Sequence, residues 1–150
     1  MAEAIDLSLQ NVRSGKGGPF AAVVVKEGKI IARGVNRVTA TNDPTAHAEV
    51  VAIREACATV KDFQLTGCVI YTSCEPCPMC LAAIYWARLD KVYFGNTKED
   101  AAIAGFDDSF IYKEMALPVT RRKIPLAQIM REEAIRVFEE WAKSSNKIEY

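Results

Sequence analysis

The segment 68–95 constrains the fold of this chain more than any other, because it has the pattern of strand, helix and strand. Residues 68–72 are typical of a buried strand, 78–88 of a helix, and 91–95 of a second strand. Two neighbouring strands of one sheet that are joined through a helix run parallel. The chain is therefore predicted to be an α/β protein with a parallel pair of strands.

A helix and a hairpin are predicted before this segment. Apolar residues recur at helical spacing from the N-terminus until the glycine-rich stretch 15–19 stops the pattern. Two β-branched runs, 21–25 and 30–35, are separated by Glu27 and Gly28. This pattern predicts a β-hairpin that follows a short opening helix.

Two more helices are predicted further along the chain. Asn42, Asp43 and Pro44 have the residue types of an N-cap and a first helical turn, which indicates a helix over about 45–59. After an irregular stretch, a broad apolar face indicates a long final helix over 126–143. Because no linker or repeat interrupts the chain, residues 1–150 are predicted to form a single domain.

Charge and composition disfavour several classes of function. Nineteen Lys and Arg residues balance nineteen Asp and Glu residues, so the chain lacks the positive excess that binding to a phosphate backbone uses. Nucleic acid is therefore a disfavoured partner. The start of the chain lacks the basic and apolar regions of a signal peptide, and no segment reaches membrane-spanning length. The cytoplasm is the expected location, and the five cysteines are expected to be reduced, catalytic or metal-bound.

Candidate metal ligands gather at two predicted helix starts. His47 is the only histidine, which excludes a histidine-rich metal site. Cys77 and Cys80, at positions i and i+3, lie on one face of a first helical turn, where two sulfurs can reach one ion. Three protein ligands with a fourth position open are typical of catalytic zinc, whereas structural zinc sites have four.

Other interpretations of the cysteines stay open at this point. A Cys-x-x-Cys pair also occurs in redox centres and in structural zinc sites. Cys74 is the nearby candidate for the fourth ligand of a non-enzymatic, zinc-stabilised scaffold, and is otherwise predicted to be a buried wall of the site. An iron–sulfur series is disfavoured because the next position in the spacing is Ile84. Cys57 and Cys68 are predicted to be core residues.

The combination of His-x-Glu with Pro-Cys-x-x-Cys is the signature of zinc deaminases. In such a site, Glu49 is predicted to be the proton shuttle. It takes a proton from the water that attacks an aromatic carbon bearing an amino group, and it delivers protons to the ring nitrogen and the departing ammonia. The positive ends of the two helix dipoles would stabilise thiolates and developing negative charge.

These residues resemble the cytidine deaminase superfamily and, within it, the guanine deaminases of bacteria, across nearly the whole chain. The resemblance is carried by Asn36 and by the blocks 17–20, 42–49, 72–80 and 104–114. The last block is the specific one, because tRNA adenosine deaminases of the superfamily usually carry a Lys-Thr-Gly-type segment there. The resemblance implies a three-layer α/β/α fold with a mixed central sheet and one zinc ion (Zn2+) per subunit. It also implies a homodimer in which the C-terminal helix is exchanged.

The implied reaction is the hydrolytic deamination of guanine to xanthine and ammonia, with guanosine, cytosine and tRNA adenosine as alternative substrates.

Guanine presents ring N–H donors and O6 and N7 acceptors, so its site needs a carboxylate, an amide and an aromatic wall. Asp108 is predicted to accept from the ring N–H groups, and Asn36 to donate and accept. The remaining substrate-binding candidates are Phe20, Trp86, Tyr150 and Ala48. Asp108 or Tyr150 is predicted to complete the pocket of the partner subunit. If the resemblance is set aside, most of these residues could equally have structural roles, as helix caps, turn residues, core residues or dimer contacts.

Overall fold

The computed structural model describes all residues 1–150, and the chain divides into two compact units, Met1–Asp108 and Ser109–Tyr150. The first unit contains all the strands, and the second contains only helices and connecting segments. None of the helices combines the length and the apolar character that crossing a membrane would require.

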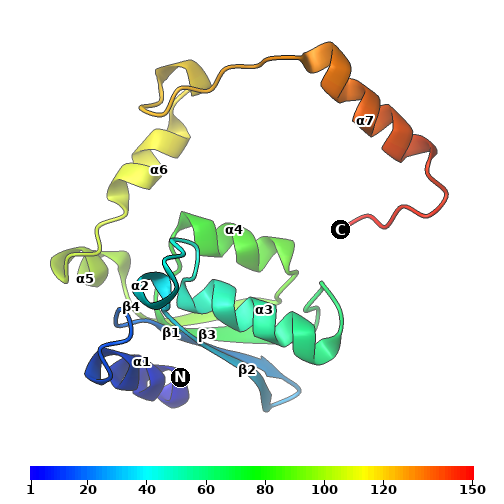
Figure 1. Ribbon diagram of the computed structural model, residues 1–150. Coiled ribbons are helices and arrows are strands. Elements are labelled where there is room, and N and C mark those ends of the chain that lie inside the picture. Colours follow the sequence, from blue (N-terminus) through cyan, green and yellow to red (C-terminus); the bar gives the residue numbers. More distant parts are fainter. The chain divides into compact units, whose positions relative to one another are not determined.

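The first unit is built on a four-stranded sheet with the strand order β2-β1-β3-β4 (Figure 1). β1 (Ala21–Lys26) and β2 (Lys29–Val35) form the predicted hairpin, and the two residues between them have φ angles of 49° and 75°, as a type I′ turn requires. β3 (Cys68–Cys74) pairs antiparallel with β1 and parallel with β4 (Lys91–Asn96). The predicted parallel pair is therefore confirmed, and the sheet is mixed.

Helices cover both faces of this sheet (Figure 1). α1 (Ala2–Arg13) packs on one face against β1 and β3, and α3 (Ala48–Val60) packs on the other against β2 and β1. α4 (Pro78–Trp86), which connects β3 to β4, lies beside α3. The predicted α/β/α architecture with a mixed central sheet is confirmed.

The contact between α3 and the sheet is unusually close because small residues line it. Ala48 and Ala52 of α3 are completely buried, and they face Gly34 of β2. A Cβ atom at Gly34 would lie 2.1 Å from the carbonyl oxygen of Ala48 and 2.5 Å from the backbone nitrogen of Ala52. Gly34 therefore fixes how closely the start of α3, with His47 as its N-cap, approaches the sheet.

We expect Gly34→Ala to destabilise the protein by about 1–3 kcal/mol, because the backbone of α3 has to move to admit the methyl group. Thermal unfolding of the purified variant measures this as a lower Tm. Lys29→Ala, at an exposed position of the same strand, is the matched control and should leave the Tm nearly unchanged. A Gly34→Ala variant as stable as the wild type would show that the approach is not tight.

The start of α3 differs from the prediction. Asp43 does not cap this helix, because its carboxylate accepts hydrogen bonds from the backbone N–H of Thr45 at 2.8 Å and from the Thr45 hydroxyl at 2.7 Å. These bonds form a local turn. The N-cap is His47, so the helix begins at Ala48 and not at 45. A short helix that was not predicted, α2 (Val38–Thr41), precedes the turn.

The stretch after β4 is more regular than predicted. α5 (Lys98–Ile103) begins with a capping box, in which the Thr97 side chain accepts from the backbone of Asp100 and the Asp100 side chain accepts from the backbone of Thr97. In the second unit, α6 (Ser109–Ala116) is followed by the short 3₁₀ helix η1 (Val119–Arg121). Residues 104–108, between α5 and α6, and residues 122–130, before the final helix, are irregular.

The final helix, α7 (Arg131–Lys143), is shorter than the predicted helix over 126–143. Met130, its N-cap, has a φ of 51°, which interrupts helical geometry before Arg131. The helix has a clear apolar face, and three of its large apolar side chains are exposed in the chain: Val137, Phe138 and Trp141. Exchange of this helix between two subunits stays a prediction.

Candidate active site

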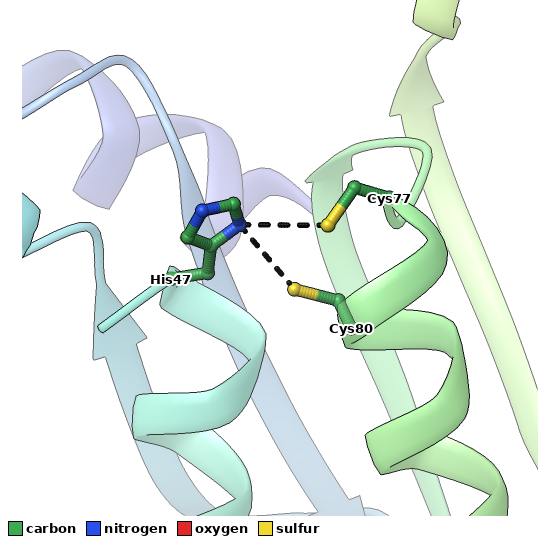
Figure 2. A group of neighbouring side chains, drawn as sticks. All are labelled: His47, Cys77 and Cys80. Carbon is green, nitrogen blue, oxygen red and sulfur yellow. Dashed lines mark hydrogen bonds between the residues drawn. The ribbon is translucent and has the colours of Figure 1, made fainter. Parts of the chain in front are cut away.

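Three potential metal ligands meet where α3 and α4 begin (Figure 2). His47 Nδ1 lies 3.6 Å from Cys77 Sγ and 3.5 Å from Cys80 Sγ, and the three atoms lie within 4.8 Å of one another. Tetrahedral zinc, with Zn–N and Zn–S bonds of about 2.0 and 2.3 Å, places nitrogen and sulfur about 3.5 Å apart. The separations therefore fit one zinc ion.

Local backbone structure presents these side chains to a common point. His47 is the N-cap of α3 and Cys77 is the N-cap of α4. Pro78 follows at the first position of α4, where its missing N–H costs no helical hydrogen bond. Cys80 lies in the first turn of α4. Both helix starts present the positive end of a dipole, which stabilises thiolate ligands.

The two ligand thiols have opposite pKa shifts. A hydrogen bond from Cys80, together with one from His47, lowers the pKa of Cys77 to about 4. The bond to Cys77 and burial raise the pKa of Cys80, and the bond to Cys77 also raises the pKa of His47. In the absence of metal, the trio of His47, Cys77 and Cys80 thus shares protons. Zinc binding releases them, because the ion binds thiolates and neutral imidazole.

Glu49 lies beside this trio and faces the same cavity. Its Oε2 accepts a hydrogen bond from Cys80 Sγ at 3.4 Å, and the residue is 8% exposed. Burial raises the pKa of Glu49. A carboxyl group whose pKa is closer to neutrality accepts and returns protons more readily, so Glu49 is suited to proton transfer.

A cavity of about 460 Å³ opens onto these residues, a size typical of small-molecule sites. Residues predicted for the site that line it are Phe20, Asn36, His47, Glu49, Cys77 and Asp108. Burial raises the pKa of Asp108, and the nearby Lys98, which also lines the cavity, opposes this increase. The structure therefore brings the predicted zinc ligands, carboxylates and amide to one place.

Three other substrate-binding candidates are not among the residues of the first unit that line the cavity. Ala48 is completely buried at the first position of α3. Trp86 is the last residue of α4, is 61% exposed and does not line the cavity. Tyr150 belongs to the second unit. Contacts of these residues with substrate stay predictions.

Phe106 is a cavity residue that was not singled out from the sequence, although it belongs to the specific block 104–114. Its ring packs edge-to-face on Phe20, with ring centroids 4.9 Å apart and an angle of 85° between the planes. Gly18 lies against both rings, since a Cβ there would be 3.3 Å from Phe20 and 3.6 Å from Phe106. The pair forms an apolar wall suited to a flat ring.

Cys74 lines the cavity but does not join the ligand group. Its Sγ contacts the carbonyl oxygen of Thr97 at 3.5 Å, and burial raises the pKa of Cys74 to about 11. The predicted role as a buried wall is confirmed. Because no fourth side chain joins the trio, the arrangement is that of catalytic zinc rather than a closed structural site.

Comparison with known proteins agrees with this geometry. Residues 1–96 match the cytidine and deoxycytidylate deaminase zinc-binding region. The chain belongs to this deaminase family. His47, Cys77 and Cys80 are its zinc site.

One relative in the family is similar over the full length. The chain is 54% identical over 150 residues to a guanine deaminase from Bacillus subtilis (strain 168), which covers 100% of this chain and 96% of that protein. An X-ray structure of guanine deaminase from Bacillus subtilis has a TM-score of 0.97, with 99% of this chain and 95% of that chain covered.

Other family members are less similar. A tRNA-specific adenosine deaminase from Aquifex aeolicus is 47% identical over 76 residues, which cover 51% of this chain and 50% of that protein. The structure of NE0047 in complex with 2,6-diaminopurine is 28% identical, with a TM-score of 0.68, and covers 99% of this chain and 82% of that chain. The similarity to the tRNA enzyme thus involves half of the chain, whereas that to guanine deaminase involves all of it.

Proposed function

We propose that the chain catalyses the hydrolytic deamination of guanine to xanthine and ammonia. The observation that carries this proposal is the position of the buried Glu49 carboxylate, 3.4 Å from the ligand sulfur of Cys80, at a cavity that Asn36 and Asp108 also line. This set combines a zinc site, a proton carrier and the polar groups that guanine needs. Full-length similarity to a guanine deaminase supports the choice of substrate.

Each residue of the cavity has its own role in the proposed reaction. Zinc, when bound to the trio, supplies Lewis-acid activation of water. Glu49 takes a proton from the attacking water and returns protons to the ring nitrogen and to the leaving ammonia. Asp108 accepts hydrogen bonds from the ring N–H groups, and Asn36 donates to an acceptor of the purine. The wall formed by Phe20 and Phe106 holds the ring plane.

A substrate panel tests the proposal. Ammonia release by the zinc-loaded protein is measured side by side with guanine, guanosine, cytosine, adenine and tRNA. Guanine should give the highest kcat/KM. If guanine is inert while another member reacts, the substrate assignment is wrong and the zinc chemistry stands.

We also propose that the protein works as a homodimer in which α7 is exchanged. The exposed apolar side chains of α7, Val137, Phe138 and Trp141, are suited to cover a second copy. Because Asp108 already lines the cavity of its own chain, the partner would then complete the pocket through Tyr150. Light scattering at micromolar concentration should give the mass of a dimer, whereas the mass of a monomer would contradict this proposal.

The end of the chain should contribute to turnover. Deleting residues 147–150 removes Ile148 and Tyr150, apolar and aromatic groups that would close the pocket and exclude water. We expect the kcat for guanine to fall at least about tenfold, with the dimer and its zinc intact. Steady-state kinetics, light scattering and metal analysis measure these three quantities.

The paired charges of the same tail provide a control. Lys147 and Glu149 lie 3.8 Å apart, and replacing both by alanine leaves Ile148 and Tyr150 in place. This double variant should keep the wild-type kcat. Unchanged kinetics after the full deletion would show that the pocket closes without the tail.

The chemistry of the ligands also supports the expected location. All five cysteines are free thiols, and two of them are needed as zinc ligands. Such thiols persist in a reducing compartment, so the cytoplasm stays the predicted location.

A further inference from the structure

Asn11, in α1, is a buried polar residue that the proposed chemistry does not use. It is only 6% exposed. Its Nδ2 donates hydrogen bonds to the carbonyl oxygen of Gly18 at 2.8 Å and to the carbonyl oxygen of Asn36 at 3.0 Å. Both acceptors belong to residues that line the cavity. One side chain therefore connects the helix layer opposite α3 to the wall of the active site.

The structure fixes Asn36 through three of its four polar groups. Its backbone N–H donates to the carbonyl oxygen of Phe20 at 3.0 Å, and its backbone carbonyl accepts from Asn11. Its Oδ1 accepts from the backbone N–H of Val38 at 3.3 Å. The remaining group, Nδ2, takes part in none of these hydrogen bonds, and Asn36 lines the cavity. Asn36 is thus held so that one donor group is left for a ligand.

Gly17 lies close to the same carbonyl group. A Cβ atom at Gly17 would lie 2.1 Å from the Asn36 carbonyl oxygen and 2.9 Å from Asn11 Nδ2. The Asn36 carbonyl group is therefore confined between the Asn11 carboxamide and the glycine loop. A change at Asn11 removes the hydrogen bond that keeps the carbonyl group in this position.

We propose that Asn11 is a positioning residue for substrate recognition, which acts by orienting the Asn36 carboxamide toward an acceptor atom of the purine. This inference rests on the proposed function, because it assumes that Asn36 contacts the base. Asn11 itself does not line the cavity. Its loss should weaken purine binding through Asn36 and leave the zinc site and Glu49 in place.

A double-mutant cycle tests this. Asn11→Leu keeps the branching and the number of non-hydrogen atoms of the side chain but removes both hydrogen bonds, and it should lower kcat/KM for guanine by about tenfold, mainly through KM. In an Asn36→Ala background, the same change should have almost no further effect, because the group that it orients is gone. Zinc content should stay at the wild-type level in all variants. Gln10→Ala, at an exposed position of α1, is the matched control and should keep wild-type kinetics.

Equal losses from Asn11→Leu in both backgrounds would overturn the inference, because Asn11 would then act on the fold in general. If Asn11→Leu does not fold, Asn11→Ala, which removes the donor group without adding a charge, takes its place in the cycle with the same expected outcome. A wild-type protein that is zinc-loaded but inactive with guanine would overturn the proposed function, and this inference with it. An active wild type with additive losses would overturn the inference alone.

Discussion

Replacing Glu49 by alanine should lower the turnover of guanine by a factor of roughly 10² to 10⁴, the range expected for losing a general acid–base group. Zinc should stay bound, because His47, Cys77 and Cys80 remain. The carboxylate is buried at 8% exposure and faces the cavity, so no solvent-exposed group replaces it. Steady-state kinetics and metal analysis on the same preparation measure the two effects separately.

Two further variants make the Glu49 experiment specific. Glu49→Gln keeps the size of the side chain but cannot carry the proton, so it should be nearly as slow as Glu49→Ala. Glu55→Ala, at an exposed position of the same helix, should be as active as the wild type. Loss of zinc together with activity in Glu49→Ala would show instead that Glu49 is a ligand or the support of one.

Cys80→Ala should abolish zinc binding at stoichiometric metal and reduce deamination to background. Two ligands would remain at a site whose three donor atoms lie within 4.8 Å of one another, and catalytic zinc sites use three protein ligands. Metal analysis after dialysis against zinc-free buffer measures the loss.

The neighbouring thiol of Cys74 offers a matched control for that change. Cys74 is buried close to the site and bonds to the carbonyl oxygen of Thr97 rather than to the trio. Cys74→Ala should therefore retain one zinc per chain. If both variants lost zinc equally, Cys74 would be a fourth ligand, and the structural-scaffold interpretation would replace catalysis.

The zinc ligands could be predicted from the sequence because their arrangement is mostly local. Cys77 and Cys80 are one helical turn apart, and they follow the carboxyl end of β3. The position of His47 relative to them depends on the whole first unit. It was predicted only because the two motifs together are typical of one kind of site.

Features that depend on competition between local bonds were harder to predict. Asp43 has the residue type of an N-cap, but its carboxylate forms a turn with Thr45 and leaves the cap to His47. The capping box of α5 is a local pattern that the sequence contains as Thr97 and Asp100, three residues apart.

Long-range contacts could not be derived from the sequence pattern. Asn11 lies in a helix whose apolar spacing was recognised, yet its partner Asn36 is 25 residues away. The positions of the aromatic side chains could not be derived either, because the residue type does not determine where a side chain points. Phe106 packs on Phe20 in the cavity, whereas Trp86 is exposed at the end of α4.

The most direct test of the account is the conversion of guanine by protein that contains one zinc ion per chain, with xanthine and ammonia measured together. We expect the two products in equal amounts, loss of the activity when a chelator removes the metal, and its return when zinc is added back. Guanine that remains unchanged in the presence of fully zinc-loaded protein would contradict the account.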